Sequence, residues 1–237
     1  QFEFKSSTNN YKKGFFNQGL EAVFDNYDKI LDVILPTLGS ERRKTYSPFL
    51  PICKSSGRVL QVAVDNIDKK KKEIQFFNPI SGNKESYSIF DGNCKLQWKV
   101  DWAMRWYVLG VDYEMNGKDL IESFILSSKI SRIIGVKPPN NFTYELFLDE
   151  KGEKISKSIG NGISVEDWLN FSPRESLELF MFQNPTRAKR LYFDVIPKMT
   201  DDYLRLRKDY EDLDSNKKLE SPVWFLNNEK KFKIFEK

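Results

Sequence analysis

The chain has 237 residues, with 38 Lys and Arg against 34 Asp and Glu, two Cys and no His. Without histidine, the chain cannot itself supply a Ser-His-Asp or Cys-His nucleophilic site, a histidine zinc centre or a histidine general base. The net charge of +4 permits a contact with nucleic acid but does not demand one, since a solvated mixed-charge surface gives similar counts.

The first part of the chain predicts one helix and a small antiparallel insertion. Apolar side chains recur at three and four positions from Asn17 to Leu35, which predicts an amphipathic helix that ends at Pro36. Three β-rich stretches predict the strands of the insertion, at residues 59–64, 74–77 and 87–90. The consecutive lysines at 69–72 have two interpretations, a solvated hairpin edge or a contact with RNA phosphates.

The two cysteines, Cys53 and Cys94, are far apart and form no Cys-x-x-Cys motif. Because no histidine can complete a tetrahedral set, the sequence predicts no zinc site. Two free thiols in a reducing cytosol are the expected state. The longest apolar runs are too short to span a bilayer, so a soluble chain is expected.

The middle of the chain predicts alternating helices and strands. A helix from Trp98 to Leu109 ends at Gly110 and places Trp98, Trp102 and Trp106 at helical spacing. These rings form either part of the core or a platform for a ligand. The sequence then predicts a strand, a helix and a strand, at 111–115, 120–134 and 144–148. This order is typical of a parallel sheet.

Beyond a Gly-punctuated loop at 150–162, the sequence predicts two helices and a polar tail. Residues 172–175 (Ser-Pro-Arg-Glu) have the spacing of a capping box that opens the first helix. The second helix is expected from Arg187 to about Asp212. The chain beyond Asp214 is polar apart from the apolar cluster 221–226, which predicts a linker or the start of another domain.

One segment of the loop carries side chains suited to phosphate chemistry: Lys154, Ile155, Ser156, Lys157 and Ser158. Two ammonium groups on a glycine-hinged loop between a strand and a helix can bend over a triphosphate. They would then neutralise the charge that builds on a leaving pyrophosphate, mainly in the transition state. On these residues alone, a solvent-exposed turn is the alternative.

The same segment resembles the KMSKS signature of the class I aminoacyl-tRNA synthetases, with Ile155 in the place of Met. Gly117-Lys118-Asp119 resembles the Gly-x-Asp element that these enzymes place against the nucleotide ribose. Residues 95–102 and 46–51 resemble one group in particular, the class I lysyl-tRNA synthetases of the archaeal type, which also occur in some bacteria. The resemblance extends from about residue 2 to residue 212.

For the ATP site, the resemblance implies a role for each matched residue of the signature. Lys154 and Lys157 would be the catalytic residues that bind the ATP phosphates. The other members would complete the ATP-binding loop: Ile155, Ser156 and Ser158.

The resemblance also implies residues for the adenosine and for the amino acid. Gly117 and Asp119 would approach the adenosine, with Asp119 accepting hydrogen bonds from the ribose hydroxyls. Trp98 and Tyr144 would form walls of a lysine-binding pocket, where an aromatic face holds an ammonium group. Packing in the core is the alternative for both rings. Relatives carry a His directly after the Gly-Lys-Asp element, where this chain has Leu120.

In terms of fold, the resemblance implies an α/β chain: the second half of a Rossmann-like catalytic domain with a small antiparallel insertion, followed by a helical connecting segment. The expected parts are a catalytic portion at 1–162 with the insertion at about 58–97, a helical stem-contact region at 163–214, and a linker at 215–237 toward an absent anticodon-binding domain. Class I synthetases also carry a HIGH signature whose histidines contact ATP, and this chain has no His. We therefore expect a fragment of a longer enzyme that is inactive by itself.

In terms of activity, the resemblance implies a lysine–tRNA ligase that uses ATP to form lysyl-adenylate from L-lysine and then charges tRNA(Lys). Mg²⁺ is expected on the ATP phosphates. No zinc, no dedicated metal site and no membrane contact are expected, and the location should be cytoplasmic. Two alternatives stay open: a non-catalytic RNA-binding or regulatory fragment with a synthetase-like fold, and another synthetase or nucleotidyltransferase with a KMSKS signature. The tryptophan segment argues against the last.

Overall fold

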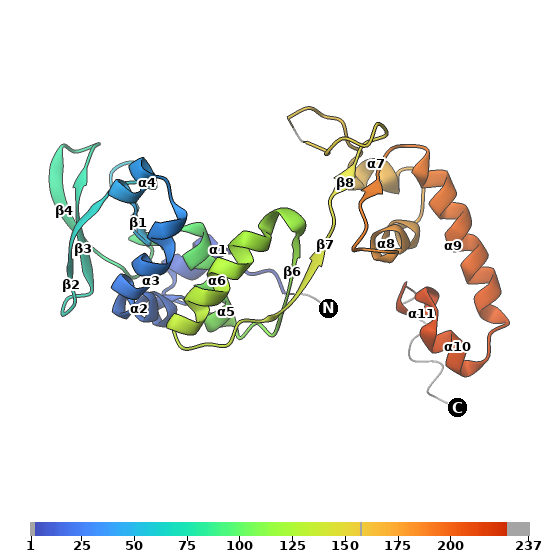
Figure 1. Cartoon of the computed structure of the whole chain (residues 1–237), viewed down its shortest axis with the longest axis horizontal. Coiled ribbons are helices and arrows are strands. Elements are labelled where there is room, and N and C mark those ends of the chain that lie inside the picture. The colour runs from blue at the N-terminus through green and yellow to red at the C-terminus, as the bar shows by residue number, and fades with distance from the viewer. Residues whose placement is uncertain (1–2, 157, 227–237) are drawn as a thin grey trace. The chain divides into compact units, whose positions relative to one another are not determined.

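The computed structural model describes residues 3–156 and 158–226, which form a mixed α/β chain with two compact units (Figure 1). The first unit holds the chain up to Asn116 together with Leu120–Phe142. The second holds Gly117–Asp119 together with the chain from Thr143 onward. The boundary predicted after residue 162 therefore falls inside the second unit.

Short helices form most of the first unit. Their bounds are α1 Ser7–Lys12, α2 Asn17–Asp25, α3 Tyr27–Ile34, α4 Ser40–Thr45, α5 Trp98–Leu109 and α6 Ile121–Ile133, with a 3-10 turn at η1 Leu35–Thr37. A second 3-10 turn, η2 Lys118–Leu120, spans residues of both units. The single helix predicted at 17–35 is wrong, because the chain breaks at Asn26, with φ of −107°. The Asn26 side-chain amide donates to the carbonyl of Ala22 at 3.0 Å and so competes with the backbone bonds that continue a helix.

The antiparallel insertion is confirmed, although its strands are shifted. β2 Val64–Asp68, β3 Glu73–Asn78 and β4 Asn83–Ser88 form an antiparallel sheet in the order β2-β3-β4. The first strand thus starts at the end of the predicted 59–64, and the third starts before the predicted 87–90. Ile74 and Phe76 are buried on one face of β3, and Tyr87 pairs with Ile74, so burial of this face sets the register.

The pairing of β1 Phe49–Pro51 with β5 Cys94–Leu96 brings the two ends of the insertion together, in antiparallel register. The lysine run lies at the turn between β2 and β3. Lys72 Nζ lies 2.5 Å from Asp25 Oδ1 and 3.2 Å from Glu21 Oε1, so it ties the hairpin to α2. A structural role is thereby supported for Lys72, while an RNA contact by the rest of the run stays a prediction.

The core of the first unit forms where α5 packs against α2 and α6, and α3 packs against α6. Its buried side chains include Leu20, Phe24, Ile30, Met104 and Ile130. This core holds α5, the predicted tryptophan helix, and α5 ends at Gly110 as expected. Among residues 3–156 and 158–226, no helix combines the length and the apolar character that a membrane span requires.

β6 Tyr113–Gly117 and β7 Asn140–Tyr144 form a two-stranded sheet, with α6 between them in sequence. This matches the predicted order of strand, helix and strand, although the strand predicted at 144–148 overlaps β7 only at Tyr144 and otherwise contains the later strand β8 Phe147–Leu148. The chain passes from one unit to the other within these two strands. The described strands form sheets of two or three strands, so the described residues do not build a larger parallel sheet.

The second unit consists of one short parallel strand pair and five helices within the described residues. Their bounds are β8 Phe147–Leu148, β9 Lys189–Arg190, α7 Val165–Leu169, α8 Arg174–Phe182, α9 Val195–Glu211, α10 Ser215–Glu220 and α11 Pro222–Leu226. The helices enclose a core that contains Trp168, Leu179, Ile196, Tyr203 and Leu226. The helix predicted from Arg187 begins later, at Val195, because residues 189–190 pair with β8 instead.

The predicted capping box at 172–175 is wrong, and a capping box lies earlier in the chain. Ser164 Oγ accepts from the backbone N–H of Asp167 at 3.0 Å, and the Asp167 carboxylate accepts from the N–H of Ser164 at 2.9 Å, which caps α7. The Ser172 hydroxyl is buried instead, 2.6 Å from Ser176 Oγ and 2.5 Å from Thr200 Oγ1. The Ser172 hydroxyl therefore bonds to these side chains and does not cap the N-terminus of α8.

The segment expected as a linker is helical as far as Leu226. Asp214 caps α10 by accepting from the backbone N–H groups of Asn216 and Lys217, at 3.1 and 3.0 Å. Val223 and Leu226 of the apolar cluster are buried, and α11 packs against α8 and α9. The apolar cluster thus belongs to the core of the second unit.

Candidate functional site

The predicted signature loop lies between β8 and α7, and it is organised around the side-chain amide of Asn161. Asn161 Oδ1 accepts from the backbone N–H of Ser156 at 2.9 Å. Its Nδ2 donates to Asp149 Oδ2 at 2.8 Å and to the carbonyl of Lys154 at 3.3 Å. One amide thus holds the outgoing and the returning parts of the loop together. Lys157 lies outside the described residues.

The other signature residues differ in their surroundings. The hydroxyls of Ser156 and Ser158 lie 2.9 Å apart. A Cβ added at Gly162 would lie 2.6 Å from Ile155 Cγ2, so glycine permits the close approach of the two sides of the loop. Lys154 is exposed, and its backbone forms an antiparallel bridge with Leu148. The fold therefore holds the loop backbone and leaves the ammonium group of Lys154 at the surface.

Asp149 is a buried carboxylate at the base of this loop. Its Oδ1 accepts from the backbone N–H of Glu153 at 2.8 Å, and its Oδ2 accepts from Asn161. These hydrogen bonds, first the one from the backbone of Glu153, hold the pKa of the Asp149 carboxyl below its usual range. The ionised carboxylate is therefore the form that the loop stabilises.

A pocket of about 360 Å³ beside the loop is acidic. Its wall includes the carboxylates of Asp149, Glu150 and Glu153 and one lysine, Lys151. Carboxylates repel a phosphate group at this range. A triphosphate therefore suits the exposed side of the loop, where Lys154 lies, better than this pocket.

Three of the predicted residues, Gly117, Asp119 and Tyr144, lie together in the second unit. A Cβ added at Gly117 would lie 2.7 Å from Asp119 Oδ1 and 3.4 Å from Tyr144 Cε2, so a larger residue would displace the carboxylate. Asp119 is exposed and can accept hydrogen bonds from a ligand. Lys118 points elsewhere, since its Nζ lies 2.8 Å from Glu145 Oε1.

Trp98 lies in the first unit, at the start of α5, with 44% of its surface exposed. Its ring stacks on Trp102 with centroids 4.9 Å apart and an interplanar angle of 20°. Trp102 in turn lies 5.2 Å from Trp106, and both of these rings are buried. Trp102 and Trp106 are therefore core residues, whereas Trp98 presents a face to solvent and stays a candidate platform for a ligand.

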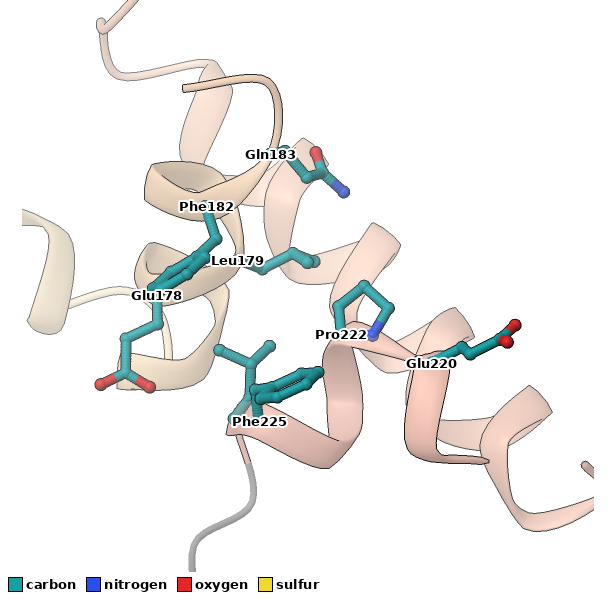
Figure 2. Close-up of a pocket in the computed structure, with 8 residues that line it drawn as sticks. Glu178, Leu179, Phe182, Gln183, Glu220, Pro222 and Phe225 are labelled. Carbon is teal, nitrogen blue, oxygen red and sulfur yellow. The ribbon is translucent and has the colours of Figure 1, made fainter. Parts of the chain in front are cut away.

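The second unit also contains an apolar pocket of about 590 Å³ between α8 and α11 (Figure 2). Its wall includes the aromatic rings of Phe182 and Phe225, and its acidic members are Glu178 and Glu220. The residues that line it include none of the predicted site residues and no lysine or arginine. This pocket therefore lacks the cations that an ATP site requires.

The described residues hold no group of three or more Cys, Asp or Glu side chains placed to bind a metal ion. They therefore do not fit a dedicated Mg²⁺ site, and no step of the chemistry is assigned to one. Cys53 and Cys94 are both free, as the sequence predicts, and the structure shows that both are buried.

Comparison with known proteins places this chain in a family. The family model described as tRNA synthetases class I (K) matches residues 1–230. The chain belongs to the class I (K) tRNA synthetases. Curated proteins named lysine–tRNA ligase from Rickettsia felis, Rickettsia africae and Rickettsia bellii are 51%, 50% and 50% identical to it over 229 residues, which is 96% of this chain. These alignments cover 43% of the first relative and 44% of the other two, so the chain spans less than half the length of the relatives it matches.

Three residues of this class I (K) synthetase chain were not assigned from the sequence, although the structure gives them contacts beside predicted residues: Asp149 and Asn161 at the signature loop of the second unit, and Glu114 at the tryptophans of the first. Asn161 lies three residues after Ser158, and this closeness to the signature is a local signal. Asp149 directly follows strand β8 and precedes the turn at Gly152, a common place for a carboxylate that accepts backbone N–H groups. No local signal indicates Glu114, because its partners are the tryptophans of α5.

On the prediction that the signature loop binds ATP, replacing Asn161 by Asp in the full-length protein is expected to raise the KM for ATP about tenfold. The change keeps the side-chain size but removes the amide donor and sets a second carboxylate against Asp149. The KM for ATP in amino-acid-dependent ATP–pyrophosphate exchange measures the effect. Asn216→Asp, which adds the same charge at an exposed position of α10, is the control. A KM within twofold of the parent value would contradict the prediction.

The Asp149 carboxyl is expected to titrate below about 3.9, the ordinary aspartate value. Its folded pKa lies below its unfolded pKa, so its contribution to stability is complete above the unfolded value and is lost as pH falls through the folded value. A ¹³C NMR titration of the aspartate carboxyls measures this pKa directly. The variant Asn161→Ala should move the Asp149 pKa back toward 3.9, and an unperturbed pKa in the parent protein would exclude the hydrogen bonds described for the loop.

Proposed function

We propose that the full-length polypeptide is a class I lysine–tRNA ligase, which activates L-lysine with ATP and transfers it to tRNA(Lys). The observation that carries this proposal is the identity of 50% to 51% over 229 residues with curated proteins of that name. The family match over residues 1–230 supports the class I assignment. The chain contributes a part of such an enzyme, since its relatives are more than twice as long as the aligned segment.

In this function the substrate carboxylate is the nucleophile. One oxygen of the lysine carboxylate attacks the α-phosphorus of ATP, the bond to the β-phosphate oxygen breaks, and pyrophosphate leaves. A ribose hydroxyl of the tRNA terminus then attacks the carbonyl of lysyl-adenylate, and AMP leaves. Neither step needs a covalent nucleophile from the enzyme, which suits a chain without histidine. Positioning and charge neutralisation are the tasks left to side chains.

The signature loop, matched to KMSKS, carries the charge neutralisation. Lys154 and Lys157 bind the ATP phosphates and offset the charge that develops on pyrophosphate. Ile155, Ser156 and Ser158 complete the ATP-binding loop. The exposed position of Lys154 and the amide clamp of Asn161 support this assignment, because they leave an ammonium group available on an ordered backbone.

The remaining predicted residues recognise the adenosine and the amino acid. Asp119 accepts hydrogen bonds from the ribose hydroxyls, and Gly117 permits the close approach of the nucleotide. Trp98 of the first unit and Tyr144 of the second are each proposed to offer an aromatic face that attracts the ammonium group of lysine. The exposed faces of both rings support this role. Leu120 leaves the position of the family histidine apolar, so aromatic contacts carry more of the recognition.

The proposal includes the finer parts of the family likeness. Residues 1–162 belong to the second half of a Rossmann-like catalytic domain, residues 163–214 to a helical stem-contact region, and 215–237 lead toward an anticodon-binding domain. The order β6, α6, β7 supports the first of these. ATP is used as its Mg²⁺ complex, and the enzyme needs no zinc. The enzyme acts on tRNA(Lys) in the cytoplasm, where translation takes place.

Lysine-dependent exchange of pyrophosphate into ATP by the full-length polypeptide tests the function. We expect exchange with L-lysine and none above background with arginine or ornithine, followed by lysylation of tRNA(Lys). Absence of exchange with every amino acid, together with tRNA binding that weakens steeply with salt, would reject the ligase and indicate an RNA-binding module.

A further inference from the structure

Trp98, Trp102 and Trp106 form a row of neighbouring rings along one side of α5, in which Trp98 stacks on Trp102 and Trp102 is tilted against Trp106. A single carboxylate oxygen binds the inner two. Glu114 Oε2 accepts from Trp102 Nε1 at 3.1 Å and from Trp106 Nε1 at 2.7 Å. Phe124 of α6 lies against the same two rings, with centroids 6.0 and 5.1 Å away. The positions of the inner indoles are therefore set by a hydrogen-bonded carboxylate on one side and by aromatic packing on the other.

The exposed fraction of the side chain increases along the row from Trp106 to Trp98. Trp106 is 1% exposed, Trp102 is 7% exposed and Trp98 is 44% exposed. Because Trp98 stacks on Trp102, one of its faces is covered and the other is free. The row thus has a buried inner end that is bound to a carboxylate and an outer end with an open aromatic face.

Among the described residues, no lysine or arginine forms a salt bridge with Glu114, whose carboxylate accepts the two indole N–H groups. A carboxylate that accepts a hydrogen bond from an indole N–H polarises that N–H bond. The electron density of the indole ring increases as a result. Cations bind an aromatic face through that electron density, and they also feel the carboxylate itself across a partly buried site. Both effects strengthen the attraction of an ammonium group to the outer ring, and neither acts on an uncharged side chain.

We propose that Glu114 is a positioning and specificity-determining residue for the amino acid substrate, and that it acts through the tryptophan row on the open face of Trp98. This inference rests on the proposed lysine contact of Trp98. Glu114 makes no contact with the substrate in this scheme. It orients the row and sets its electrostatic preference, so that the site favours a side chain that ends in a primary ammonium group over an uncharged side chain of the same length.

The variant Glu114→Gln tests the charge with little change of shape. Gln keeps the size and an oxygen that can accept from both indoles, but it carries no charge. In the full-length enzyme we expect the KM for lysine in ATP–pyrophosphate exchange to rise about fivefold or more, within the range of a cation–π contact. The maximal rate and the KM for ATP should stay within about twofold of the parent, because the reacting groups are untouched.

Norleucine distinguishes the electrostatic role from a purely structural one. Its side chain has no ammonium group, so its inhibition constant should be the same in the parent and in Glu114→Gln. A structural role would weaken both ligands equally. Glu122→Gln is the matched control, since it removes an exposed carboxylate from the first turn of α6 in the same unit, and it should leave the KM for lysine unchanged.

Two outcomes of these measurements would contradict a proposal, and a third would require a second variant. Parent enzyme without lysine-dependent exchange overturns the proposed function, whatever Glu114 does. Active parent enzyme with an unchanged KM for lysine in Glu114→Gln, or with norleucine weakened to the same extent as lysine, overturns the role of Glu114 alone. If Glu114→Gln does not fold, Trp102→Phe decides, because it keeps the stacked ring and removes one of the two N–H donors. We expect it to raise the KM for lysine, and an unchanged KM there would overturn the role.

Discussion

Replacing Lys157 by Ala in the full-length synthetase is expected to slow lysine-dependent ATP–pyrophosphate exchange by roughly 10² or more. The lysine ammonium is proposed to offset charge on the departing pyrophosphate, and that charge is largest in the transition state. The loss should therefore appear mainly in the maximal rate, with a smaller change in the KM for lysine.

Lys151→Ala supplies the matched control for this experiment. Lys151 is an exposed lysine on the same loop, it lies before the signature, and it belongs to the acidic pocket rather than to the proposed phosphate side. We expect its exchange rate to stay within about twofold of the parent. Exchange near the parent rate in Lys157→Ala would remove the ATP role from the signature loop.

Replacing Trp168 by Ala is expected to destabilise the second unit by about 3 to 5 kcal/mol, the range for a large aromatic side chain lost from a core. Trp168 is 1% exposed, and its ring lies 5.4 Å from that of Phe180. Its Nε1 donates to Ser176 Oγ at 2.9 Å, so Ala leaves both a cavity and a buried hydroxyl with one partner fewer. Because α7 follows the signature loop directly, the loop loses its C-terminal support.

Hydrogen exchange followed by mass spectrometry measures this loss unit by unit. We expect faster exchange in peptides from α7, α8 and α9, and unchanged protection in α5 and α6, which belong to the first unit. Leu169→Ala is the control, since Leu169 neighbours Trp168 on α7 but is 47% exposed. A loss of less than about 1 kcal/mol in Trp168→Ala would show that the core assigned to the second unit does not depend on this ring.

The signature loop is recognisable without the structure because its information is local. Lys154, Ser156 and Ser158 can be identified with no knowledge of distant partners, since the residue types, the glycines and the order of strand, loop and helix all lie within one short stretch. The same holds for the helix from Trp98 to Leu109, where spacing alone predicts one face.

The sequence-based predictions fail at positions where a local structural preference competes with a contact to a residue distant in sequence. The capping spacing at 172–175 was sound as a pattern, but Ser172 is buried against Thr200, and the cap lies at Ser164. The apolar cluster 221–226 looked isolated in a polar tail, yet Val223 and Leu226 complete a core built from helices earlier in the chain. Propensity is a weak prior wherever burial can override it.

By itself, the sequence determined the family likeness, the place of the signature loop that is proposed to bind phosphates, and the helix from Trp98 to Leu109, because each depends on neighbouring residues. Only the tertiary structure decided that Trp98 is the exposed end of the tryptophan row, that Glu114 binds the inner indoles, and that Gly117 lies against Tyr144. These contacts join positions on different elements, and their existence depends on how the elements pack. No spacing along the chain encodes them, since packing energy depends on distance in space and not on separation in sequence.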